Sequence, residues 1–133
     1  MSGLGTPIEI RPEARGDEAA IFALTEAAFK GMEFSDGSEQ YIVDALRNDG
    51  DLTLSLVAVD KLRIVGHIAF SPLTITDGAA HWYGLGPVSV TPELQRKGIG
   101  RTLIQRGIAD MREKGAHGIA LLGSIEYYPR FGF

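Results

Sequence analysis

The sequence has no cysteine among its 133 residues. This absence excludes disulfide frameworks, thiolate zinc sites, iron–sulfur clusters and any covalent mechanism through a cysteine thioester. Lysine and arginine form no block and the formal net charge is −4, so composition gives no footprint for nucleic acid or for an anionic membrane. The longest apolar runs fall well short of the roughly 18 residues that a membrane span needs. We therefore expect a soluble, cytoplasmic protein.

What is present is an ordinary globular composition, with 44% hydrophobic and 23% charged residues. A chain of 133 residues is long enough to bury a complete core. No period of about 20 to 50 residues repeats, and no linker rich in proline or serine divides the chain. We predict one domain over residues 1–133.

Hydrophobic spacing predicts the order of the elements. Strands are expected over residues 8–11, 53–59, 64–75, 82–90 and 119–122, and helices over residues 17–30, 38–47 and 99–114. The strand, helix and strand from 82 to 122 form a βαβ unit, whose strands are parallel, whereas the earlier hairpin is antiparallel. The fold class is therefore α/β, with a mixed, partly antiparallel sheet and helices packed on its faces.

Two further patterns concern packing. The apolar residues that mark the buried stripe of each later helix are Tyr41, Ile42, Ala45 and Leu46 in the second, and Ile99, Leu103, Ile104, Ile108 and Met111 in the third. Strand 82–90 is interrupted by Gly84, Gly86 and Pro87. Such residues in a strand are typical of a bulge, an edge or the close approach of another chain.

A glycine motif, Gln95-Arg96-Lys97-Gly98-Ile99-Gly100, lies between that strand and the third helix. The unpaired N–H groups of a helix N-terminus, here from about Arg96 to Thr102, carry partial positive charge and bind phosphate. Gly98 and Gly100 let the backbone approach an anion closely, and Arg96, Lys97 and Arg101 add charge. Pyrophosphate is the expected ligand, although a helix that merely caps itself is the alternative interpretation.

Two other phosphate motifs do not fit these residues. A dinucleotide fingerprint needs a third glycine where this chain has Leu103. A P-loop needs Gly-Lys-Ser/Thr, which the chain lacks.

The run from Leu85 to Ile104 resembles the acetyl-coenzyme A-binding core of the GNAT N-acetyltransferase superfamily, whose signature is Gln/Arg-x-x-Gly-x-Gly/Ala behind a strand. The resemblance extends in order over residues 8–133. It implies the GNAT fold, acetyl-coenzyme A as co-substrate and no metal. The residues that it implies for the pyrophosphate are Gln95, Arg96, Lys97, Gly98, Ile99, Gly100, Arg101 and Thr102.

The same resemblance gives a role to the interrupted strand. It implies that the backbone of Val88 and Val90, with Ser89 between them, pairs with the pantetheine arm like an added strand. Residues 119–122 would then form the other wall of the cleft.

The segment Tyr127-Tyr128-Pro129-Arg130-Phe131-Gly132-Phe133 resembles the family's aromatic-Tyr-x-x-x-Gly-Phe segment. The resemblance implies that Tyr128 is the general acid. A phenol with a pKa near 10 can donate a proton or hydrogen bond to the leaving thiolate of coenzyme A. The alternative is that both tyrosines fill the core at a turn.

Other polar residues are less specific. Glu33, Asp36, Glu39 and Tyr41 lie where the family usually builds its acceptor pocket, and each charge alone is equally typical of a solvated surface. His67 either faces the acceptor cleft or is a hydrogen-bonded sheet histidine. His81 and His117 share no metal-ligand spacing with it. Neither Ser89 nor Ser124 has a nucleophile elbow, which favours direct transfer in a ternary complex over an acyl-enzyme.

The chain departs from the family pattern at its C-terminal end. Gly123-Ser124-Ile125-Glu126 replaces the Gly-Asp-Pro of similar members. Two further strands, about 20 residues, usually follow Gly-Phe. We expect that the last two strands are missing from this chain, or that a second copy covers the open edge as a homodimer.

These observations favour transfer of an acetyl group to an amine of a small molecule or a protein. A non-catalytic acyl-coenzyme A-binding or sensor module is the alternative. An interaction domain without a nucleotide ligand is a third, and it requires the glycine motif to be coincidental.

Overall fold

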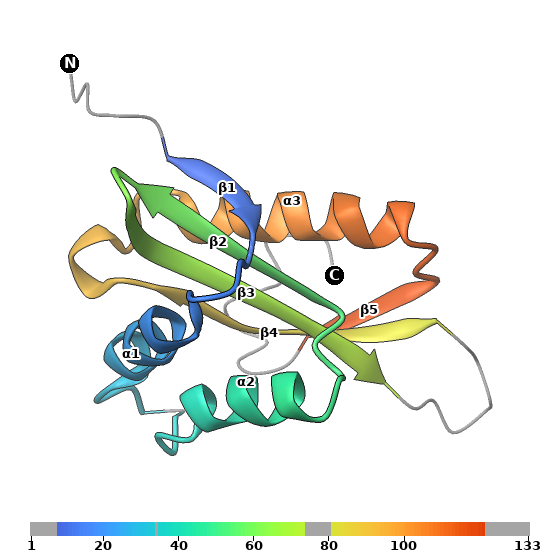
Figure 1. Ribbon diagram of the computed structural model, residues 1–133, viewed down its shortest axis with the longest axis horizontal. Helices are drawn as coiled ribbons and strands as arrows, with labels where there is room; N and C mark the ends of the chain where they lie inside the picture. Colours follow the sequence, from blue (N-terminus) through green and yellow to red (C-terminus); the bar gives the residue numbers. More distant parts are fainter. Residues whose placement is uncertain (1–7, 34, 74–80, 122–133) are drawn as a thin grey trace.

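The computed structural model describes residues 8–33, 35–73 and 81–121, which form a mixed five-stranded sheet in the order β1-β2-β3-β4-β5 (Figure 1). The strands are β1 Glu9–Pro12, β2 Leu54–Asp60, β3 Arg63–Leu73, β4 Trp82–Val90 and β5 Gly118–Leu121. The helices are α1 Glu18–Phe29, α2 Glu39–Asn48 and α3 Ile99–Glu113, with a 3₁₀ turn at Pro92–Leu94. Neighbouring strands are antiparallel except β4 and β5, which are parallel. The predicted mixed α/β sheet is confirmed.

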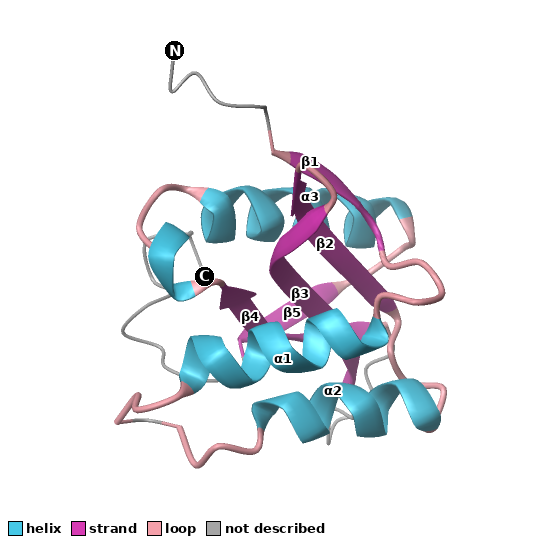
Figure 2. Cartoon of the chain, turned by 60° about the vertical axis from the view of Figure 1, so that its left-hand side comes forward, coloured by secondary structure: helices cyan, strands magenta, loops and turns pink. Residues whose placement is uncertain are grey.

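The helices cover both faces of the sheet. Helix α3 packs on one face, and α1 and α2 lie together on the other (Figure 2). The larger part of the core lies under α3 and includes Leu56, Ile68, Phe70, Leu85, Leu103, Ile104 and Met111. The smaller part lies under α1 and α2 and comprises Ile21, Val43, Val57 and Val59. The predicted stripe of α3 is confirmed, with Ile108 at its edge.

Two glycines let α3 approach the sheet closely. A Cβ on Gly107 of α3 would lie 2.7 Å from Cζ of Phe70 and closer still to Cε1. A Cβ on Gly66 of β3 would lie 3.0 Å from both Ile99 and Leu103 side-chain atoms. Because both residues have only a hydrogen atom as a side chain, α3 can lie this close to the sheet.

Strand β4 contains the bulge that its glycines and proline indicate. Val88 pairs with Ile68, whereas Leu85 pairs with Phe70, so the two residues Gly86 and Pro87 lie opposite one residue of β3. An extra residue on one strand bends that strand and increases its twist. β4 consequently changes direction midway along its length.

The predicted buried stripe of α2 is wrong. Tyr41 and Ile42 are 61% and 44% exposed, while Gln40 and Val43 are 5% and 1% exposed. The inward face follows the positions 40, 43 and 47, because Arg47 at the end of this face binds a carboxylate near the sheet. An ion pair, rather than the number of apolar residues, orients this peripheral helix.

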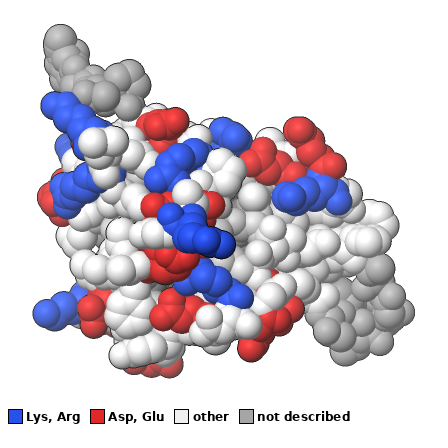
Figure 3. Space-filling view, in the orientation of Figure 1, with Lys and Arg blue, Asp and Glu red and all other residues white. Residues whose placement is uncertain are grey.

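Charges of both signs are interspersed on the face of the molecule shown in Figure 3. Within the described part of the chain, no helix has the length and apolar character needed to cross a bilayer.

Candidate functional site

The first three residues of α3 have backbone N–H groups with no acceptor within the helix. The N–H of Thr102 donates to the carbonyl of Gly98 at 3.0 Å, which makes Gly98 the N-cap. The N–H groups of Ile99, Gly100 and Arg101 come before the first bonded turn, so the helix itself provides no acceptor for them. The hydroxyl of Thr102 also bonds to Gly98, at 2.9 Å. Of the predicted residues 96–102, Thr102 thus has its N–H bonded at the start of the helix, whereas the N–H groups of residues 96–101 have no backbone acceptor among the described residues.

Backbone conformation and charge accompany these N–H groups. Arg96 and Gly98 both have positive φ, at 67° and 93°. A positive φ is uncommon in residues with a side chain and often marks a functional segment. The side chains of Arg96, Lys97 and Arg101 are exposed around the helix terminus, while that of Ile99 is buried in the core. Ile99 therefore contributes to this site through its backbone.

Next to this terminus, strand β4 has an unoccupied edge among the described residues. The N–H of Thr91 donates to Val65 of β3 at 2.9 Å. Because backbone groups alternate along a strand, those of Val88 and Val90 point away from β3. β5 pairs with β4 only over Trp82–Leu85 in the described chain. The edge of β4 at Val88 and Val90 therefore has no neighbouring strand among the described residues, and its pairing with an extended ligand stays a prediction.

Gln95 reduces the number of backbone groups on this edge of β4 that a ligand can bond to. Its Nε2 donates to the carbonyl of Val90 at 2.9 Å. The carbonyl of Val90 is therefore already hydrogen-bonded. The groups of this edge that remain for a ligand are the N–H of Val90 and the N–H and carbonyl of Val88.

A second set of contacts holds the connection between β4 and α3. Arg63 Nη2 donates to Glu93 Oε2 at 2.7 Å, and the hydroxyl of Thr91 donates to Glu93 Oε1 at 2.7 Å. The hydrogen bond from Arg63, followed by that from Thr91, lowers the pKa of Glu93 to about 2. These contacts tie the 3₁₀ turn to the start of β3.

The side chain of Ser89 points to the face of the sheet that α1 covers, opposite to the face under α3. It is 1% exposed, and its hydroxyl donates to Thr25 Oγ1 of α1 at 3.3 Å. Thr25 in turn donates to the carbonyl of Ile21 at 2.8 Å. Ser89 thus joins β4 to α1 while its neighbours line the open edge.

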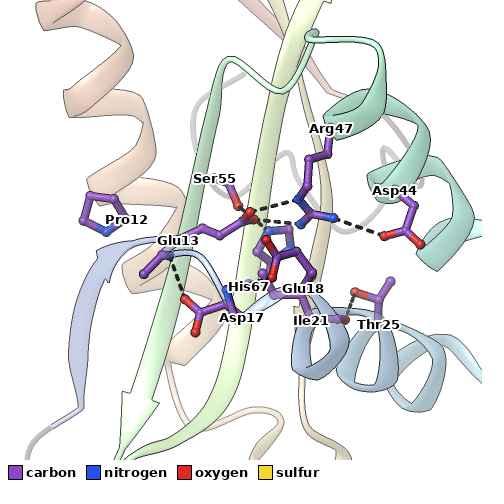
Figure 4. A network of polar contacts seen from close by, with 12 residues as sticks. Pro12, Glu13, Asp17, Glu18, Ile21, Thr25, Asp44, Arg47, Ser55 and His67 are labelled. Atoms are coloured by element: carbon purple, nitrogen blue, oxygen red, sulfur yellow. Dashed lines mark hydrogen bonds and ion pairs between the residues drawn. The ribbon is translucent and has the colours of Figure 1, made fainter.

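His67 is fully buried and hydrogen-bonded within the sheet, which agrees with the second of the two alternatives predicted for it (Figure 4). Its Nε2 lies 2.8 Å from the hydroxyl of Ser55. Ser55 donates to Glu13 Oε1 at 2.6 Å, and Arg47 donates to both carboxylate oxygens of Glu13 at 2.8 and 2.9 Å. Since the hydroxyl proton of Ser55 is used, His67 donates through Nε2–H.

Electrostatics agrees with a neutral ring. Burial, opposed by the charge of Glu13 and assisted by that of Arg47, lowers the pKa of His67 to about 4. Burial alone would raise the pKa of Glu13, but hydrogen bonds from Arg47 and Ser55 lower it overall. Sequence reasoning missed Glu13, Arg47 and Ser55, because they come from three separate segments and form no motif.

A hollow of about 520 Å³, here called the α1–α2 cavity, lies between these two helices and the segment that joins them. It is lined by Ala23, Glu26, Ala27, Phe29, Lys30, Gly31, Ser35, Gly37 and Gln40. The cavity lies in the expected acceptor region, but its lining residues are not the four that the sequence indicated. Asp36 and Glu39 instead accept hydrogen bonds from Ser38 and Ser35.

The remaining predicted residues are placed as follows. Tyr128 lies outside the described residues, as does the chain after Leu121. The rings of His81 and His117 lie edge to face with centroids 5.2 Å apart. Among residues 8–33, 35–73 and 81–121, no three histidine or carboxylate side chains gather as a metal-binding group.

Comparison with known proteins agrees with this geometry. The model of the acetyltransferase (GNAT) family matches residues 19–133. The Uncharacterized N-acetyltransferase YhbS of Escherichia coli K12 is 36% identical over 125 residues, which cover 93% of this chain and 72% of that protein. The crystal structure of YhbS in complex with CoA has a TM-score of 0.85 at 34% identity, covering 95% of this chain and 68% of that one.

A second solved structure is more similar in sequence. The GNAT family acetyltransferase from Brucella melitensis, crystallised in complex with acetyl-CoA, has a TM-score of 0.90 at 51% identity. The alignment covers 96% of this chain and 82% of that one. With its glycine motif at a helix N-terminus beside a bulged strand, the chain belongs to the GNAT acetyltransferase family.

Proposed function

We propose that this protein transfers an acetyl group from acetyl-coenzyme A to a primary amine of a small molecule or a protein. The observation that carries the proposal is the placement of two binding features at either end of residues 91–98. The open edge of β4 precedes this connection, and the free N–H groups of α3 follow it. A ligand with an extended amide arm and a pyrophosphate fits both features.

Each feature has a distinct role in binding. The N–H groups of Ile99, Gly100 and Arg101 face the pyrophosphate, and the helix dipole favours its negative charge. The side chains of Arg96 and Lys97 add long-range attraction. The backbone of Val88 and the N–H of Val90 pair with the pantetheine amides, as an added strand pairs with a sheet edge. The acetyl-CoA and CoA complexes of the two similar structures support this assignment.

The proposed reaction is a direct attack within a ternary complex. The neutral amine nitrogen attacks the thioester carbon, a C–N bond forms, and the C–S bond breaks as coenzyme A leaves. Tyr128 donates a proton to the departing thiolate. The amine loses a proton to solvent, and solvent returns one to the Tyr128 phenolate. No cysteine is available in the chain for an acyl-enzyme, which supports a single transfer.

Calorimetric titration with acetyl-coenzyme A and thiol release across a panel of amines test the proposal together. Binding with amine-dependent thiol release is the expected result, and Tyr128→Phe should lower the release rate while binding persists. Binding without turnover on any amine would indicate the sensor module instead. An absence of binding to folded protein would exclude both.

A further inference from the structure

The α1–α2 cavity carries one positive and one negative side chain on the same wall. Glu26 belongs to the last turn of α1 and Lys30 follows the helix end, four residues later. Side chains at this spacing are neighbours, about 6 Å apart at their Cβ atoms. Both are exposed to solvent.

These two charges do not neutralise each other. A glutamate four residues before a lysine is the favourable order for an ion pair on a helix. Nevertheless, among the residues that the structure describes, the ion pairs join other side chains, and neither Glu26 nor Lys30 takes part in one. Each charge therefore remains available to a group of opposite sign.

Gln40 gives the second, independent observation. It lines the same cavity and is only 5% exposed, yet its Oε1 has no hydrogen-bond partner within the described chain. A buried amide oxygen without a donor costs free energy, and a bound N–H group removes that cost directly or through one water. The wall of the cavity thus combines a carboxylate and an ammonium group with a buried glutamine whose amide oxygen lacks a donor among the described residues.

We infer that the acceptor is a small zwitterion, a primary amine whose molecule also carries a carboxylate, as in a dipeptide. Glu26 attracts the cationic end, Lys30 binds the carboxylate, and Gln40 accepts an N–H. The volume of about 520 Å³ is that of a small-molecule site. A polyamine would face the charge of Lys30, and a purely anionic molecule that of Glu26. The term acceptor rests on the proposed function, whereas the ligand class rests on the cavity.

The cavity wall is fixed relative to the co-substrate strand. Thr25 of α1 accepts the hydroxyl hydrogen bond of Ser89 on β4, so the helix that bears Glu26 is anchored to the strand with the open edge. A ligand held by α1 is therefore held in a constant position relative to β4.

The experiment uses the whole chain and three probes. Glycylglycine is the zwitterion, glycylglycinamide keeps the amine but lacks the carboxylate, and N-acetylglycylglycine lacks the amine. Ligand-observed NMR without acetyl-coenzyme A measures binding, and thiol release measures acetyl transfer. We expect glycylglycine to bind about tenfold more tightly than either of the other two probes. Its kcat/KM for acetyl transfer should be about tenfold higher than that of glycylglycinamide.

Variants assign the preference to the cavity. Lys30→Gln should abolish the preference for glycylglycine over its amide. Glu26→Gln should weaken the binding of both glycylglycine and its amide. Exchange of the two charges, Glu26→Lys with Lys30→Glu, should restore the preference because both charges are again present. Lys61→Gln removes an equally exposed lysine from the β2–β3 turn and should change nothing.

The outcomes separate the two proposals. Equal use of glycylglycine and its amide, or a preference that survives Lys30→Gln, overturns the zwitterion inference while acetyl transfer to other amines stands. Preferential NMR binding of glycylglycine that Lys30→Gln abolishes supports the cavity's ligand class even if no thiol is released. In that case it is the proposed function that fails.

Discussion

The side chain of Gln95 is bonded to the main chain of Val90: its Nε2 donates to the Val90 carbonyl at 2.9 Å. This contact joins the first residue of the glycine motif to the last residue of β4. It fixes the open strand edge and the helix N-terminus relative to each other, although the 3₁₀ turn lies between them.

Gln95→Ala should therefore weaken acetyl-coenzyme A binding about fivefold, which corresponds to the loss of one hydrogen bond of about 1 kcal/mol. The free energy of unfolding should fall by no more than about 1 kcal/mol, the contribution of the same half-buried hydrogen bond. Calorimetric titration measures the first quantity and urea unfolding the second. Gln105→Ala, on the exposed side of α3, is the matched control. Equal affinities for the two variants would show that the contact does not order the site.

Gly98→Ala and Gly115→Ala form a matched pair at the two ends of α3. The two glycines have nearly equal φ values, 93° and 91°, and an added Cβ meets nothing within 4 Å at either position. Each substitution should cost about 1 to 2 kcal/mol of stability, because alanine is strained at positive φ. Only Gly98→Ala should also raise the Kd for acetyl-coenzyme A, about tenfold.

Thermal unfolding and calorimetric titration of both variants check this prediction. If Gly115→Ala weakens acetyl-coenzyme A binding as much as Gly98→Ala does, the effect belongs to the stability of α3 and not to an anion site at its N-terminus.

Stability should fall as the pH is lowered below about 6.5, because of His67. Its pKa is about 4 in the fold against 6.5 for the ordinary side chain. Between these values the unfolded chain binds a proton that the folded chain does not, so unfolding becomes easier by up to about 3 kcal/mol. Glu13 acts in the same direction at lower pH, since its pKa is also lowered and its contribution is lost as it becomes protonated.

Urea unfolding at several pH values between 4.5 and 7 measures this slope. His67→Gln has no proton to gain and should flatten it, while His117→Gln, an exposed position, should leave it unchanged. A slope that persists in His67→Gln would assign the pH dependence to other groups.

Gly107→Ala should destabilise the fold by about 1 to 3 kcal/mol through overpacking against Phe70. Phe70→Leu alone leaves space in the core and is also destabilising. The double variant should be less destabilised than the sum of the two single effects, because the new methyl group occupies part of that space. Urea unfolding of the four proteins measures the coupling, and strict additivity would contradict the close approach of α3 to β3.

Most of the framework could be predicted from sequence, because α3 and the central strands bury regular apolar patterns. The bulge in β4 was also indicated locally, by Gly86 and Pro87. The buried face of α2 could not be predicted, because that helix is oriented by the hydrogen bonds from Arg47 to Glu13. Glu13 lies before α1, far from α2 in the sequence. A long-range ion pair leaves no periodic signal in either segment.

The candidate site divides in the same way. The glycine motif is contiguous, so the sequence alone could propose its residues as a phosphate site, and that role stays a prediction. The α1–α2 cavity could not, because Glu26 and Gln40 belong to different helices and are unremarkable in the sequence. For His67, the strand position was evident, but its partner Ser55 depends on the register of β2 against β3.

The alternation along β4 has a consequence for how this site can vary among related proteins. In the proposed complex Val88 and Val90 would offer the ligand only main-chain atoms, while their side chains pack against the core under α3. Substitution by another β-branched residue would preserve both the packing and the direction of every hydrogen bond. The proposed recognition of an extended ligand thus depends on the path of the backbone, which many different sequences can share.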